Sequence, residues 1–397
     1  MDRSPVVSSL TTMNLRHRRV FVRADLNVPL HGNNLLDDYR LQKILPTINA
    51  IQKQRGYIIL ATHLGRPRPG DTEPSTKHLI PWFEHQGYHV IFETDLSRAA
   101  ERSHDITTSS TILLLENMRL FAGEQSGDTT FAQQLRACAD IYVNDAFGVL
   151  HRHDTSVTLL AQLFEPHKRT IGLLVEQELA ALNRLLSNPP QPFMLILGGG
   201  KIADKIPLIE HMLKQINTLF LCPAPVFTFL KALGKPVGKS LVDEQQLEQC
   251  LTILRKAQDH NVTVIVPCDY LVAHRTYTGT LTYASAEHFP HEGIGISIGA
   301  QTLYHITPYI QHAGTIFYNG AMGMLERPDT LHGMKQVLEL MTQTQALTVL
   351  GGGSSAAVAQ RYGMVNGFDH VSTGGGAMLA YLSGSKLPGL EALGINK

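Results

Sequence analysis

The chain has 397 residues, of which 43% are hydrophobic and 17% charged, so it can bury two ordinary domain cores and is long for one. Its 34 lysines and arginines balance 34 aspartates and glutamates, which argues against a nucleic acid or an anionic membrane as the main partner. The four cysteines form no C-x-x-C pair, and no apolar run approaches about 18 residues, so the sequence predicts no zinc site, disulfide framework, secretion signal or membrane span. We expect a cytoplasmic protein.

Short runs rich in β-branched residues alternate along the chain with longer segments of helical spacing. Such alternation is typical of parallel βαβ units, so we expect an α/β fold. Segment 172–192 has helical spacing and ends in a proline-rich stretch, and because it separates two groups of runs it predicts the connection between two domains. The predicted strands lie at 20–24, 57–61, 89–92, 112–115, 141–143, 193–197, 218–222, 262–266, 315–318 and 346–350, and other predicted helices lie at 39–54, 130–140 and 204–216.

Arginine and histidine side chains of the first half stand where strand-like runs end. Ligands of an open parallel sheet bind beyond the carboxyl ends of its strands, so these side chains are expected to share one edge. Arginine suits an anion because its planar fork binds carboxylate or phosphate in a bidentate manner. A solvated or paired residue would explain any single arginine, but the whole set favours a site for a small, highly charged molecule. The set comprises Arg23, Arg40, His63, Arg66, Arg119, His151 and Arg152, with Asp25 and Asn27 beside it.

The second half contains three glycine clusters after strand-like runs, GGGK at 198–201, GGGSS at 351–355 and TGGGA at 373–377. Glycine lets backbone N–H groups approach phosphate oxygens, and a following helix N-terminus adds partial positive charge. Lys201 and Lys205 are four residues apart, so we place them on one face just inside the helix after the first cluster. A tight turn would explain one cluster alone, but the three clusters together favour a binding site for a polyphosphate. GGGSSA also satisfies G-x-G-x-x-A, so a NAD-dependent oxidoreductase remains an alternative.

Nine segments along the chain occur in the order of one known family. They are VFVRADLNVPL (20–30), HLGRP (63–67), LLLENMR (113–119), YVNDAFGVLHR (142–152), LGGGKIADKI (197–206), FTFLKALGKPVGKSL (227–241), YNGAMGMLE (318–326), GGGSSAAVAQRYG (351–363) and HVSTGGGAMLAYLSGSKLPGLEAL (370–393). The chain therefore resembles the phosphoglycerate kinase family over essentially its whole length. The resemblance implies two Rossmann-like lobes, each a parallel sheet flanked by helices, joined by a hinge helix. Its boundaries would be a phosphoglycerate-binding domain at 1–171, an interdomain helix at 172–190, a nucleotide-binding domain at 191–384, and a tail at 385–397 that packs back on the first domain.

The resemblance also implies an activity, namely reversible phosphoryl transfer between 1,3-bisphosphoglycerate and MgADP to give 3-phosphoglycerate and ATP, without a phosphoenzyme. The partners would be these substrates and Mg²⁺ bound with the nucleotide, with no nucleic acid or membrane, and the protein would be a monomer. The implied substrate-binding residues are Asp25, Asn27, Arg40, His63, Arg66, Arg119 and Arg152. The implied nucleotide-binding residues are Gly199, Gly200, Lys201, Lys205, Asn319, Glu326, Gly351, Gly352, Gly353, Ser354 and Ser355. Arg40, Lys201, Gly374 and Gly375 would be catalytic.

The chain departs from the family pattern on the nucleotide side. Ser354 stands where the family has an aspartate that binds magnesium, so Ser354 and the nearby Asp204 are the candidate metal ligands. Pro223 and Pro225 stand where the family has a run of glycines. Because proline removes an N–H donor and fixes φ, the wall of the adenine pocket is expected to differ. Two alternatives follow: a weakly catalytic member that serves as a triose-phosphate-binding or interaction module, or a member with altered nucleotide or metal preference.

Overall fold

The computed structural model describes residues 9–32, 34–68 and 70–395. Its contacts divide the chain into two compact units: unit 1 is Met1–Leu179 with Lys386–Lys397, and unit 2 is Ala180–Ser385. The first boundary falls inside helix α6 (Leu173–Leu186). No helix of the described ranges is both long and apolar enough to cross a membrane.

Unit 1 contains a parallel sheet of six strands. They are β1 (Arg19–Ala24), β4 (Tyr57–Ala61), β5 (His89–Glu93), β6 (Thr111–Leu115), β7 (Ile141–Asp145) and β8 (Arg169–Ile171). The strand order is β5-β6-β4-β1-β7-β8, and every neighbouring pair is parallel. A separate antiparallel pair, β2 (Leu30–His31) with β3 (Asn34–Leu35), follows β1.

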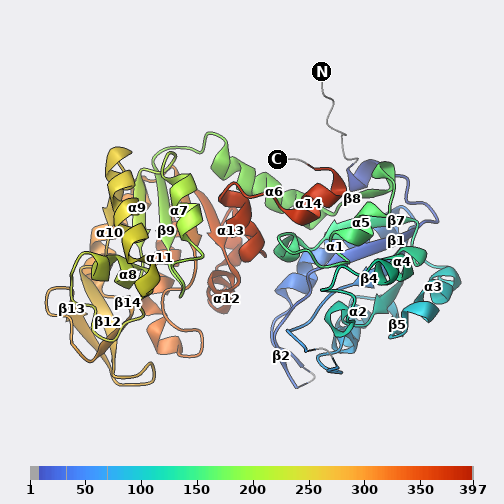
Figure 1. Ribbon diagram of the computed structural model, residues 1–397, viewed down its shortest axis with the longest axis horizontal. Helices are drawn as coiled ribbons and strands as arrows, with labels where there is room; N and C mark the ends of the chain where they lie inside the picture. Colours follow the sequence, from blue (N-terminus) through green and yellow to red (C-terminus); the bar gives the residue numbers. More distant parts are fainter. Residues whose placement is uncertain (1–8, 33, 69, 396–397) are drawn as a thin grey trace. The chain divides into compact units, whose positions relative to one another are not determined.

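Both faces of this sheet are buried under helices (Figure 1). Alternate residues of a strand point to opposite faces, so Val20 and Val22 pack in one apolar cluster and Phe21 in the other. The helices on the first face are α1 (Tyr39–Lys53) and α2 (Ile80–His85), and those on the second are α3 (Leu96–Asp105), α4 (Thr129–Ala137), α5 (Leu159–Gln162) and α14 (Pro388–Leu393). The C-terminal helix α14 contacts α5 and β8, so the end of the chain is part of unit 1.

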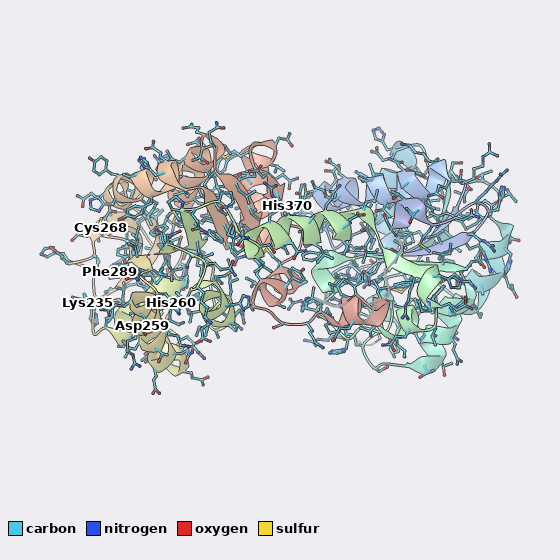
Figure 2. The ribbon with its side chains drawn as sticks, turned by 90° about the horizontal axis from the view of Figure 1, so that it is seen from above. Lys235, Asp259, His260, Cys268, Phe289 and His370 are labelled. Carbon is cyan, nitrogen blue, oxygen red and sulfur yellow. The ribbon has the colours of Figure 1, made fainter. Side chains whose placement is uncertain are left out.

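Unit 2 contains a second parallel sheet of six strands. They are β9 (Phe193–Leu197), β10 (Thr218–Leu221), β11 (Thr263–Ile265), β15 (Thr315–Asn319), β16 (Leu347–Gly351) and β17 (His370–Val371), and His370 is labelled in Figure 2. The order β11-β10-β9-β15-β16-β17 reverses between β9 and β15, as in dinucleotide-binding folds. The helices of the unit are α7 (Ile206–Met212), α8 (Pro225–Ala232), α9 (Leu247–Asp259), α10 (Ala300–His312), α11 (His332–Thr342), α12 (Gly353–Arg361) and α13 (Gly376–Leu382).

A small antiparallel sheet interrupts the α/β pattern of unit 2. Its order is β13 (Leu281–Ser285), β12 (Asp269–His274) and β14 (Gly293–Ile298). Three rings pack beneath it, because Phe289 lies edge-on to Phe227 and to Tyr270 at centroid distances of 5.6 and 5.4 Å. Figure 2 shows Phe289 and Cys268 in this part of the unit. This sheet was not predicted from the sequence.

The fold class expected from the sequence is confirmed, since both main sheets are parallel and flanked by helices. One local prediction is wrong. Lys201 and Lys205 do not lie inside a helix, because α7 begins only at Ile206. Pro207 suits the first turn of a helix, and Gly199 has φ of +84°, so residues 198–205 form a loop before the helix starts.

Candidate functional site

A buried carboxylate organises the charged cluster of unit 1. Asp25 follows β1, and its Oδ2 forms an ion pair with Nη1 of Arg40, which lies in the first turn of α1. His63 follows the neighbouring strand β4, and its Nε2 lies 3.8 Å from Oδ1 of Asp25. The carboxyl ends of β1 and β4 and the first turn of α1 therefore bring these three predicted residues together.

The charges of the cluster shift the pKa values of Asp25 and His63. Burial alone would raise the pKa of Asp25, but attraction to Arg40, His63 and Arg23 outweighs burial and lowers it to about 2. Burial lowers the pKa of His63 well below its usual value, and the neighbouring arginines add to this effect against the attraction of Asp25. His63 is consequently neutral at pH 7, and its buried Nδ1 has no hydrogen-bond partner among the described residues.

Hydrogen bonds fix the loop after β4 against its neighbours. The Asn27 side-chain oxygen accepts from the Gly65 N–H at 2.8 Å, and Nη1 of Arg119 donates to the Gly65 carbonyl at 2.5 Å. Asn117 holds the preceding residue of this loop, since its side chain bonds both the N–H and the carbonyl of Leu64. Asn117 was missed in the sequence, although it stands in the LLLENMR segment at the end of β6.

The remaining arginines of the set have different roles. Arg66 is exposed, and Arg152 is partly exposed with its Nε bonded to Asp154 at 2.9 Å, so both guanidinium groups are accessible to an anion. Arg23 is not available: its side chain is fully buried, lies 3.5 Å from Glu124 and donates to Ser156 at 2.7 Å. The prediction that Arg23 offers its charge to a ligand is therefore wrong, because a buried carboxylate already neutralises it.

The glycine loops of unit 2 meet at the point where the strand order reverses. Two backbone bonds join the first glycine loop to the end of β15 and the loop after it, from Gly198 N–H to the Asn319 carbonyl at 2.8 Å and from Gly199 N–H to the Ala321 carbonyl at 2.7 Å. Gly352, between β16 and α12, has φ of +93°, which an L-residue rarely adopts. In a doubly wound sheet, this reversal point is where ligands bind.

Two adjoining cavities lie over these loops. The larger, of about 750 Å³, is lined by Gly200, Lys201, Asp204, Lys205, Ser354 and Gly375 among others. Lys205 is 6% exposed, donates to the Lys201 carbonyl at 3.3 Å and has a pKa that burial lowers from its ordinary value. The many glycine N–H groups and the two lysines suit the oxygens of a polyphosphate.

The smaller cavity, of about 300 Å³, shares Gly199, Gly200 and Ser354 with the larger one. Its other walls include Pro223, Ala224, Tyr277, Ile296 and Glu326. Ala224 has φ of +76°, and both neighbours of Ala224 are prolines, so this wall offers few backbone donors. Tyr277 was not predicted, because no sequence motif places it near the glycine loops.

Some predicted residues do not line either cavity. Ser355 is fully buried, where its hydroxyl donates to the Gly351 carbonyl at 2.8 Å and accepts from the Gly320 N–H at 2.9 Å. Asn319 lines the larger cavity but donates to the same Gly351 carbonyl at 3.0 Å. Gly351 and Gly374 are not among the lining residues, whereas Gly375 is. Ser355 and Gly351 thus tie the loops together beneath the cavity.

Nearly the whole chain matches one protein family, since the family model for phosphoglycerate kinase covers residues 10–385. The chain belongs to the phosphoglycerate kinase family. The phosphoglycerate kinase of Bdellovibrio bacteriovorus is 34% identical over 98% of this chain and 97% of its own, and that of Chlamydia trachomatis serovar A is 39% identical over 97% and 98%. Solved phosphoglycerate kinases from Pyrococcus horikoshii OT3 and Coxiella burnetii match with TM-scores of 0.86 and 0.81, at 27% and 28% identity, over 98% of both chains in each comparison.

The donor set for a metal ion in this phosphoglycerate kinase family member is small. Among the described residues, no group of three or more His, Cys, Asp or Glu side chains could hold an ion. Asp204 is the carboxylate that lines the larger cavity, and the Ser354 hydroxyl lines both cavities. A Mg²⁺ ion bound with nucleotide needs only one or two carboxylates beside phosphate oxygens and water. One carboxylate and one hydroxyl therefore fit an ion that takes most of its ligands from the nucleotide.

Proposed function

We propose that this chain catalyses reversible phosphoryl transfer between 1,3-bisphosphoglycerate and ADP, a step of glycolysis and gluconeogenesis. The supporting observation is that one phosphoglycerate kinase family chain carries both a cationic cluster at the strand ends of unit 1 and glycine-loop cavities at the sheet reversal of unit 2. Family membership and the balanced charge also support a cytoplasmic protein that acts on small molecules, and we expect a monomer.

The acid substrate is assigned to unit 1. Arg66, Arg119 and Arg152 would bind the negative oxygens of 3-phosphoglycerate, with guanidinium forks that suit carboxylate and phosphate. Neutral His63 can donate one hydrogen bond, and Asp25 with Asn27 can accept bonds from the substrate hydroxyl. Because Asp25 remains ionised far below neutral pH, it keeps Arg40 oriented whether or not the substrate is bound.

The nucleotide is assigned to unit 2. Its phosphates would lie along the N–H groups of Gly200 and Gly353 with Lys201 and Lys205, while the Gly199 N–H stays bonded to the Ala321 carbonyl. Glu326 would accept from ribose hydroxyls in the smaller cavity. Magnesium bound with the nucleotide supplies charge neutralisation, and Ser354 and Asp204 are the residues that would hold it.

The chemistry exchanges one oxygen–phosphorus bond for another. In the direction of ATP synthesis, a β-phosphate oxygen of ADP attacks the acyl phosphate, the bond from the carboxyl oxygen to phosphorus breaks, and the carboxylate of 3-phosphoglycerate leaves. Little proton transfer is required, so catalysis depends on alignment and on neutralising the three equatorial oxygens. Arg40, Lys201 and the backbone at Gly374 and Gly375 are the groups proposed for this neutralisation.

A coupled assay with 3-phosphoglycerate and MgATP tests the proposal directly. We expect turnover with MgATP, and the same assay with GTP and with manganese measures nucleotide and metal preference. A protein that binds 3-phosphoglycerate in calorimetry but gives no turnover under any of these conditions would be a binding module instead. NADH titration followed by fluorescence addresses the oxidoreductase alternative, for which we expect no binding.

A further inference from the structure

Unit 1 has a second cationic site at the edge of its sheet opposite to the substrate cluster. The parallel strands β1, β7 and β8 begin at Arg19, Ile141 and Arg169, so their amino ends lie at one edge. A cavity of about 340 Å³ opens there, lined by Arg18, Arg136, Asp140, His167 and Lys168 with neighbouring residues. The substrate residues follow the carboxyl ends of the same strands, so this cavity, named here the amino-edge pocket, is separate from them.

The amino-edge pocket carries an excess of positive charge. Its lining contains three cations, Arg18, Arg136 and Lys168, and one carboxylate, Asp140. Arg19 and Glu165 adjoin the pocket through ion pairs with Asp140 and Lys168. Asp140 is already neutralised by Arg19, whose Nη2 donates to Oδ1 at 2.8 Å and whose backbone N–H donates to Oδ2 at 2.9 Å. Glu165 lies 3.1 Å from Lys168 and 3.2 Å from His167 on the rim. Arg18 and Arg136 feel the charges of Asp140 and Glu165, but among the described residues neither forms an ion pair with a carboxylate within 4.0 Å.

Arg136 is held in a fixed orientation without being neutralised. Its guanidinium carbon lies 4.2 Å from the centre of the Phe164 ring, Nη1 donates to the Ala139 carbonyl at 2.6 Å, and Nε donates to the Leu163 carbonyl at 3.4 Å. Carbonyl oxygens and an aromatic face leave the charge in place, and Nη2 makes no hydrogen bond within the described ranges. Little side-chain entropy is lost when such a preorganised group binds an anion.

We propose that the amino-edge pocket binds a small multivalent anion, a phosphate or polycarboxylate compound, independently of the catalytic substrates. The volume is at the lower end of the range for ligand sites and accommodates a compound of the size of pyrophosphate or citrate rather than a macromolecule. Arg136 provides the oriented guanidinium group, and Arg18 and Lys168 provide the two further cations of the lining. At such a site, the protein binds a second anion that does not compete with 3-phosphoglycerate.

Titration calorimetry with pyrophosphate tests this on the full chain. Saturating 3-phosphoglycerate and ADP, a pair that cannot react with each other, fill the catalytic sites, and a chelator removes divalent metal. We expect one further equivalent of pyrophosphate to bind. Because Arg18 is exposed and the Lys168 side chain is 40% exposed, the double variant Arg18→Glu with Lys168→Glu is expected to fold and to weaken this binding at least about tenfold.

A matched control separates the pocket from net charge. Lys214→Glu with Arg255→Glu changes two exposed cations of unit 2 by the same amount and should leave pyrophosphate affinity within about twofold, while both double variants retain the parent kcat. If citrate competes with pyrophosphate for the same site, the ligand class extends to polycarboxylates and the proposal is supported. The proposal would be overturned if no further equivalent of pyrophosphate binds, or if both double variants weaken its binding equally. It would also be overturned if the binding heats of citrate and pyrophosphate add, because the two anions would then bind at different sites.

Discussion

Asp25 and Arg40 form an ion pair in which the carboxylate is almost fully buried and the guanidinium is about a quarter exposed. The buried partner holds the orientation, and the exposed partner presents charge to the edge where β1 and β4 end. An arginine arranged in this way does not need to be reoriented when a negatively charged group arrives, so its electrostatic contribution is available at once. The pair links the fold of unit 1 to the proposed chemistry.

Replacing Arg40 with alanine should lower kcat far more than it raises KM for 3-phosphoglycerate. The lost charge acts mainly on the transferring group, and removal of one such stabilising group typically costs about 10²–10³ in kcat. Lys53→Ala, an exposed cation at the other end of the same helix, is the control and should leave both constants unchanged. A raised KM with parental kcat would make Arg40 a binding residue only.

Replacing Lys201 with alanine should have a similar effect from the nucleotide side. Lys201 lines the larger cavity and lies in the loop before α7, so its side chain can reach a transferring phosphoryl group without disturbing a helix. We expect a loss of about 10²–10³ in kcat with a smaller change in the KM for ATP. Steady-state kinetics measure kcat and KM for this variant and for the control Lys214→Ala, which replaces an exposed lysine just after α7. Equal losses in the two variants would remove Lys201 from catalysis.

The buried pair of Arg23 and Glu124 should be a determinant of stability rather than of binding. Glu124→Gln leaves the Arg23 charge uncompensated where both side chains are fully buried, and this typically costs about 3–5 kcal/mol. The double variant Arg23→Met with Glu124→Leu should lose less than the sum of the two single changes. Urea unfolding followed by fluorescence of Trp82, the one tryptophan of the chain, reports on unit 1. Additive losses would show that the two side chains are not coupled.

Asp145 should make the stability of unit 1 fall as pH rises. Its carboxyl is fully buried, accepts from the Val175 N–H in α6 at 3.1 Å, and burial raises its pKa from 3.8 to about 7. Because the pKa of Asp145 is higher in the folded state than in the unfolded state, its protonation favours the folded state. This contribution to the free energy of unfolding is complete below pH 4 and is lost as the pH rises through 7. Asp145→Asn keeps an acceptor and removes the titration, so its melting temperature relative to the parent should rise between pH 5 and pH 8, with a free-energy change of a few kcal/mol at most. Parallel melting curves for both proteins across this range would contradict the prediction.

The parallel sheets were predictable because strands buried on both faces form short continuous apolar runs. All ten predicted strands have a counterpart in the structure, from β1 to β16. The start of α7 was not predictable from the spacing of Lys201 and Lys205, since the glycine loop extends further than periodicity indicates. The small sheet around β12 was missed because its antiparallel strands interrupt the alternation of strands and helices, and because β13 is too exposed to form an apolar run.

The candidate site was predictable in its residue types and less so in its partners. Strand-end position was enough to place Asp25 and His63 together, whereas Arg40 reaches Asp25 from the first turn of α1. It could not separate them from Arg23, because the neutralising Glu124 lies about a hundred residues away and carries no motif. Hydrogen bonds to backbone also leave no sequence signal, so the role of Asn117 depends on a tertiary contact.

Replacing Ser354 with aspartate should tighten binding of magnesium with the nucleotide and raise kcat/KM for MgATP. Ser354 lies at the second position of α12 and lines both cavities, so a carboxylate there would face the phosphates and add a charged ligand to the set now provided by Asp204. Ser385→Asp, which adds the same charge to the wall of the larger cavity, is the control and should weaken nucleotide binding slightly. Calorimetry of ADP with and without magnesium separates metal coordination from simple charge. If Ser354→Asp leaves the magnesium dependence of ADP binding unchanged, the serine does not occupy a metal position, and the proline-flanked wall at 223–225 becomes the feature that sets how this chain holds its nucleotide.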